Sequence, residues 1–129
     1  MKRIGILLVL AVMLTGCGRH AEIPCRVITG VDVQYQQGGA WVERTYFQQE
    51  SMEAVLNYLR MLKPEGIVLP DDPQTINCQI TVHFSDGTDK LFFQQGNIYL
   101  REGDGAWEKI DRQQAQLLYP LLLLMPSDS

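Results

Sequence analysis

The sequence has few residues that could bind a metal ion or a nucleotide. It contains two histidines and three cysteines in 129 residues, with neither Cys-x-x-Cys nor His-x-x-x-His spacing. It also lacks a glycine-rich phosphate-binding loop, a dinucleotide-binding fingerprint and the serine motif of esterases. We therefore expect no metal, no cofactor and no nucleotide, and a protein that is not an enzyme.

Positive charge is also scarce. Eleven Lys and Arg residues stand against fifteen Asp and Glu, which gives a formal net charge of −4 at pH 7. A chain with this balance is not suited to neutralising a phosphate backbone, so we expect no nucleic-acid partner. The length of 129 residues and the 46% hydrophobic content are typical of one globular domain.

No apolar run is long enough to cross a membrane as a helix. The longest one covers residues 4–14, whereas a bilayer needs roughly 20 apolar residues. Lys2 and Arg3 precede this run, and small residues follow it. A basic start, a short apolar run and small residues are typical of a secretory signal peptide.

The apolar run ends in Leu14, Thr15, Gly16 and Cys17. This stretch resembles the lipobox of bacterial lipoproteins, and the domain behind it resembles small uncharacterised envelope lipoproteins in its architecture. The resemblance implies cleavage before Cys17 and acylation of that cysteine, for example with palmitate. The protein would then be extracytoplasmic and lipid-anchored to the bacterial cell membrane, because two acyl chains are usually enough for stable attachment.

These features predict four segments. Residues 1–16 would be the signal peptide, and residues 17–24 the lipidated cysteine with a short tether that shows no periodicity. Residues 25–126 would form a single globular α+β domain, and residues 127–129 a tail.

The first half of the domain predicts a β-hairpin followed by a helix. Residues 27–36 alternate apolar and polar side chains, and residues 40–47 resume after a turn at Gly38 and Gly39. Ser51 is placed to cap the helix that follows. Its apolar stripe is Met52, Val55, Leu56, Leu59 and Leu62.

The second half predicts a β-meander and a second helix. Strands are expected at residues 77–84, 90–95 and 97–102, before a short piece at 106–110. Asp111 and Gln114 resemble a capping box before a helix at 112–125, which Pro120 should kink or shorten. We expect an α+β fold in ββα-βββα order, with an antiparallel sheet of about five strands and two helices on one face.

Cys25 and Cys78 remain as an even pair once Cys17 is lipidated. Each follows the apolar parity of its strand, so both could point into one core. Two interpretations stay open: a disulfide, as is common in exported domains, or two buried thiols that act as small hydrophobes.

The expected sheet has one face without helices, which could bind a partner. Its outward residues by the expected register are Gln34, Gln36, Gln79, Thr81, His83, Phe92, Gln94, Tyr99 and Arg101. Amide, hydroxyl and aromatic groups together can contact a peptide or a sugar, and His83, Phe92, Tyr99 and Arg101 form the candidate binding face within this set. The alternative is an ordinary solvated surface.

The sequence thus favours a lipid-anchored binding or accessory protein of the bacterial cell envelope. It would engage an envelope protein or an extracellular ligand through the candidate binding face or the Leu-rich residues 121–124. One alternative is a small envelope hydrolase that uses dispersed carboxylates and His83. Another is a passive structural lipoprotein.

Overall fold

The computed structural model describes residues 27–129. The lipobox with Cys17, the tether and Cys25 lie outside the described residues, so the signal peptide and the anchor stay predictions.

One antiparallel sheet runs in the order β2-β1-β3-β4-β5-β6. Its strands are β1 (Ile28–Gln37), β2 (Ala40–Tyr46), β3 (Cys78–Phe84), β4 (Asp89–Gln95), β5 (Tyr99–Glu102) and β6 (Trp107–Lys109). The helices are α1 (Gln49–Arg60), α2 (Arg112–Ala115) and α3 (Leu118–Leu124).

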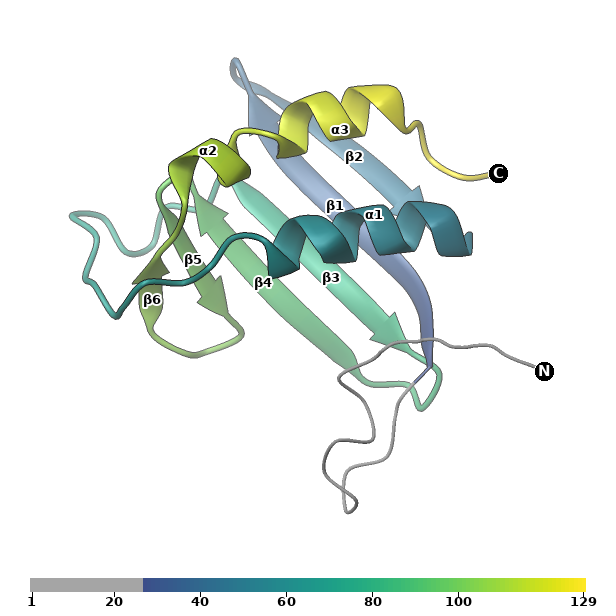
Figure 1. The fold of residues 1–129 in the computed structure, drawn as a ribbon, viewed down its shortest axis with the longest axis horizontal. Helices are drawn as coiled ribbons and strands as arrows, with labels where there is room; N and C mark the ends of the chain where they lie inside the picture. Colours follow the sequence, from purple (N-terminus) through teal and green to yellow (C-terminus); the bar gives the residue numbers. More distant parts are fainter. Residues whose placement is uncertain (1–26) are drawn as a thin grey trace.

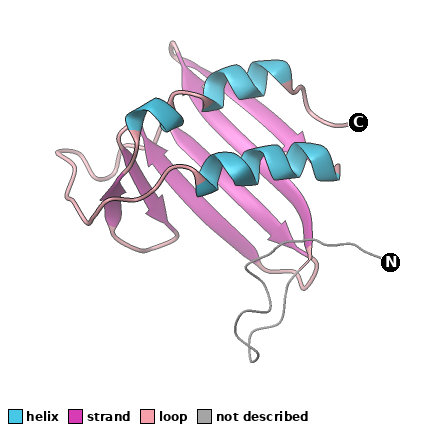
Figure 2. Ribbon diagram, in the orientation of Figure 1, coloured by secondary structure: helices cyan, strands magenta, loops and turns pink. Residues whose placement is uncertain are grey.

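All three helices lie on one face of the sheet, and the other face carries none (Figures 1 and 2). The predicted α+β class and the antiparallel sheet with helices on one face are confirmed. The sheet has six strands because the short piece at Trp107–Lys109 pairs with β5.

The core lies between the sheet and the helices. Val31, Val33 and Ile80 face α1, whose Val55 is fully buried, and the partly buried residues of the predicted stripe pack against the same cluster. Alternation with period 2 in the strands and about 3.6 in the helix produces these matching apolar faces. Tyr58 of α1 is also buried, although the sequence did not single it out.

The start of α1 differs from the expectation. Ser51 lies inside the helix instead of capping it, and the N-cap residue Gln48 has no side-chain cap of its own. Asp128, near the chain end, accepts hydrogen bonds from the backbone N–H groups of Phe47 and Gln48 and from the Ser51 hydroxyl, at 2.8 to 3.0 Å. Residues 127–129, expected to form a tail, therefore bind the start of α1, and Figure 1 shows the C-terminus beside the first turn of α1.

The C-terminal helical segment is split in two. Asp111 is the N-cap of α2, as predicted, and accepts from the backbone N–H of Gln113. Its own backbone N–H donates to the carbonyl of Leu62 and not to Gln114, the partner that a capping box requires. The break comes at residues 116–117 because Pro120 cannot donate to the carbonyl of Gln116 and its ring clashes with that group. Pro120 is tolerated in the first turn of α3, where its missing N–H would have no helical partner.

Among residues 27–129, no helix has both the length and the apolar character needed to cross a bilayer.

Candidate functional site: the open face of the sheet

Strand register decides which side chains lie on the face without helices, here called the open face. Directly paired residues in antiparallel strands point to the same side, so the buried Val31, Val33 and Ile80 mark the covered side and their neighbours mark the open one. The open face is formed by Trp41, Glu43, Thr45, Asp32, Gln34, Gln36, Gln79, Thr81, His83, Asp89, Leu91, Phe93, Gln95, Tyr99, Arg101, Trp107 and Lys109.

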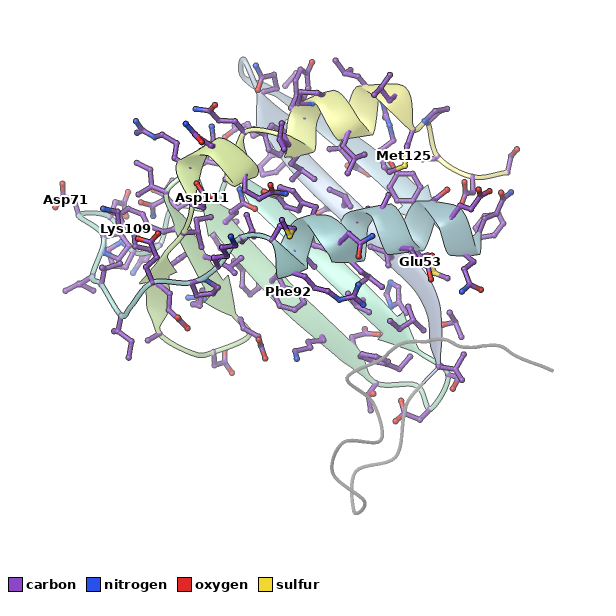
Figure 3. The ribbon with its side chains drawn as sticks, in the orientation of Figure 1. Glu53, Asp71, Phe92, Lys109, Asp111 and Met125 are labelled. Atoms are coloured by element: carbon purple, nitrogen blue, oxygen red, sulfur yellow. The ribbon has the colours of Figure 1, made fainter. Side chains whose placement is uncertain are left out.

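Three of the four candidate binding residues, His83, Tyr99 and Arg101, lie on the open face. Phe92 does not, and its expected placement is wrong. Phe92 is paired with the buried Ile80 and packs against the core, and Figure 3 shows it beside α1. Phe93 takes the open position instead. The two adjacent aromatic residues break the alternation, so only the pairing with β3 decides which one faces outward.

Gln94 was also expected on the open face but is buried, with 1% of its surface exposed. Its carbonyl accepts a hydrogen bond from the Tyr58 hydroxyl at 2.8 Å, and its amide donates to the carbonyl of Gly96. Burial raises the pKa of Tyr58, so this hydroxyl stays protonated and acts as the donor. A buried amide with both ends satisfied belongs to the core and not to a binding surface.

Of the two cysteines considered as a pair, the structure describes Cys78 alone. Cys78 is a buried free thiol at the start of β3, and Cys25 lies outside the described residues. The choice between a disulfide and two buried thiols therefore stays open.

The first polar cluster of the open face, here called the polar row, crosses four strands. His83 on β3 lies between two carboxylates: its Nε2 is 2.7 Å from Asp32 on β1 and its Nδ1 is 2.8 Å from Asp89 on β4. The Thr45 hydroxyl on β2 donates to the other oxygen of Asp32 at 2.8 Å. Direct cross-strand pairing of Asp32 with Thr45 and of His83 with Asp89 builds this row.

The two carboxylates change the chemistry of His83. The hydrogen bond to Asp32, followed by that to Asp89, raises the pKa of the imidazole, because both stabilise its protonated form. Both ring nitrogens are engaged, so neither is free to accept a proton from a substrate. Within residues 27–129, no group of three or more His, Cys, Asp or Glu side chains could hold a metal ion.

The second cluster surrounds Arg101 on β5. Its guanidinium lies over the ring of Phe93, 4.7 Å from the centroid, and over the ring of Trp107, at 5.1 Å. Cation–π contacts of this kind hold a guanidinium flat against aromatic rings. Trp107 is itself 5% exposed and fixed, because its indole N–H donates to the carbonyl of Pro73 at 3.1 Å.

A pocket of about 570 Å³ opens beside Arg101, here called the Arg101 pocket. It lies between the β5–β6 turn and the segment that joins α1 to β3, which extends beyond β6 in Figure 1. This segment is held by Val68, which donates to Trp107, and by Gln95, whose amide donates to the carbonyls of Asp72 and Thr75. The lining residues are Ile67, Val68, Leu69, Pro73, Gln74, Arg101, Gly105, Ala106 and Trp107.

Sequence reasoning identified His83 and Arg101 but missed the groups around them. Asp89 could have been found, since it flanks the turn that pairs it with His83. Asp32 is 51 residues from His83, and Pro73 is 34 residues from Trp107, so no local pattern signals either contact.

Comparisons with protein-family models, with curated proteins and with solved structures found no match to this chain. The functional proposal therefore rests on the residues and geometry of the open face.

Proposed function

We propose that this chain is a lipid-anchored extracytoplasmic binding protein of the bacterial cell envelope. It holds an envelope protein or an extracellular ligand on the open face of its sheet, at the Arg101 pocket. The anchor is Cys17, on the strength of the lipobox at Leu14–Cys17. Nine residues lie between Cys17 and Val27, so their Cα atoms are at most about 35 Å apart and binding takes place close to the membrane.

One observation carries the binding role: the face without helices has a preformed pocket with both apolar and cationic groups. Ligand sites in proteins are concave and mostly apolar, with a few polar groups that fix orientation, and they commonly measure about 300–1,000 Å³. The Arg101 pocket has this size and this mixture. Its walls are held by hydrogen bonds that involve Trp107 and Gln95.

The hydrolase alternative finds less support. A general base needs a nitrogen or oxygen free to reach the substrate proton, and both nitrogens of His83 already contact carboxylates. Asp32 is further engaged by Thr45. The polar row is thus better suited to holding strands together than to transferring protons.

Site-specific photocrosslinking in intact cells tests the binding role. A photoreactive amino acid is placed at Gln74, on the pocket wall, or at Asn57, an exposed residue on the outer side of α1. We expect a crosslinked species from position 74 and none from position 57. The species should be lost when Arg101→Met is added. Equal crosslinking from both positions, or none from position 74, would favour a passive structural lipoprotein.

A further inference from the structure

Arg101 is a cation without an anion. In the part of the chain that the structure describes, its guanidinium takes part in no hydrogen bond or ion pair, and its Nε is buried without a partner. The neighbouring carboxylate of Glu102 points to the other face and pairs with Lys90 at 3.1 Å. A guanidinium at the wall of a pocket, with no anion from the described part of the chain beside it, is available to an anion from outside.

The shape of the guanidinium favours a carboxylate. The contacts with the rings of Phe93 and Trp107 hold the guanidinium in place beside the pocket. A carboxylate matches a guanidinium edge with two parallel hydrogen bonds. Phosphate groups are commonly bound by several cations together, whereas Arg101 is the single Lys or Arg among the residues that line this pocket.

The rest of the pocket calls for an apolar group next to that carboxylate. Ile67 and Leu69 are 77% and 81% exposed, and with Trp107 they form an apolar wall beside the cation. An Asp or Glu side chain supplies a carboxylate without an apolar group. A residue that carries both is an apolar residue at the C-terminus of a chain.

We propose that the Arg101 pocket binds the C-terminal residue of a peptide or protein partner. The terminal carboxylate lies on the guanidinium of Arg101, and an apolar side chain such as that of Leu or Phe lies against Ile67, Leu69 and Trp107. This inference rests on the binding role proposed above and names the chemistry that the same pocket recognises.

Titration with short peptides tests it. The probe is an N-acetylated tripeptide that ends in Leu, used with a free carboxylate and as its C-terminal amide, and the full chain is ¹⁵N-labelled. The two tryptophans give two indole signals, so Trp107 reports on the pocket and Trp41, on the distant strand β2, is an internal control. We expect the acid to shift the Trp107 signal alone and to bind at least about tenfold more tightly than the amide.

A matched pair of variants distinguishes the loss of the positive charge at Arg101 from a general loss of folded protein. Arg101→Met keeps an unbranched stem between the rings and should weaken binding of the acid by about tenfold or more. Arg60→Met removes an exposed guanidinium on α1 and should leave binding unchanged. Circular dichroism checks the fold, and if Arg101→Met misfolds, the comparison of acid with amide in the unaltered chain decides.

Equal binding of acid and amide would overturn the inference. So would equally tight binding of octanoate, a carboxylate on an apolar chain without a peptide group. If Gln74 still crosslinks a partner in cells, either result leaves the proposed binding role in place and removes only the C-terminal recognition.

Discussion

At the scale of single residues, His83 makes the stability of the folded state depend on pH, and stability should fall as the pH rises. Its pKa is raised in the folded state, mainly by Asp32 and then by Asp89. The stabilisation it contributes is therefore fully present below the unfolded value of about 6.5 and is lost as pH rises through the folded pKa. The side chains involved are 36 to 45% exposed, so we expect a contribution below about 1 kcal/mol.

Histidine titration by NMR checks this prediction. In Asp32→Asn the pKa of His83 should fall toward 6.5 by more than in Asp89→Asn, because the hydrogen bond to Asp32 is the larger cause. The other histidine, His20, lies outside the described residues and gives a second signal, so the His83 signal is assigned with a His20→Gln variant. A His83 pKa unchanged in both variants would contradict the role of the polar row.

Sequence reasoning at this scale worked where the pattern was local. Alternation placed Cys78, Ile80 and Val82 on one side of their strand, and the structure buries all three. The pattern failed at Phe92 and Phe93, since two adjacent aromatic residues are compatible with either orientation of β4. Pairing with β3 resolves the choice, and pairing is set by a turn whose register the sequence alone left open.

At the scale of elements, α1 depends on a residue almost at the end of the chain. Asp128 accepts from Phe47 and Gln48, and these hydrogen bonds lower its pKa because they stabilise the charged form, that to Gln48 most. We expect Asp128→Ala to lower the urea midpoint of unfolding at pH 7, because the N–H groups at the start of α1 lose their acceptor. Asp104→Ala, in the exposed β5–β6 turn, should leave the midpoint unchanged.

The pH dependence of the Asp128 effect has the opposite sign to that of His83. A lowered folded-state pKa contributes stability above the unfolded value of about 3.8, and that stability is lost as pH falls through the folded pKa. The gap between the unaltered chain and Asp128→Ala should therefore close as the pH falls below 3.8. A gap that persists in strong acid would show that the negative charge of the Asp128 carboxylate is not what stabilises the start of α1.

At the scale of the whole molecule, the order of the predicted strands and helices was enough to predict the fold class, but it did not predict the Arg101 pocket. Each hairpin and helix has a local signal, for example the turn at Gly38 and Gly39, where both residues have positive φ. The Arg101 pocket instead joins residues 67–74 to residues 101–107, which are distant in sequence and which become neighbours only when the segment after α1 runs beside β6. No periodicity encodes that contact.

The proposed attachment to the membrane concerns the whole molecule, because it would determine where the open face can meet a partner. Cleavage before Cys17 would remove Lys2 and Arg3 and leave nine basic against fifteen acidic side chains, a formal charge of −6. A domain with that charge would gain no electrostatic attraction to an anionic bilayer. Each buried acyl methylene, in contrast, contributes about 0.8 kcal/mol, so the attachment proposed here depends on the lipid on Cys17.

We therefore expect Cys17→Ser to move the protein out of the membrane fraction or to leave its precursor uncleaved. Cell fractionation with a labelled fatty acid measures both outcomes. Cys78→Ser serves as the control and should keep normal processing and labelling, because Cys78 lies in the core. Lipid labelling of Cys17→Ser at the normal level would refute the anchor. The Arg101 pocket would then have to find its partner without the restriction of distance that a short tether imposes.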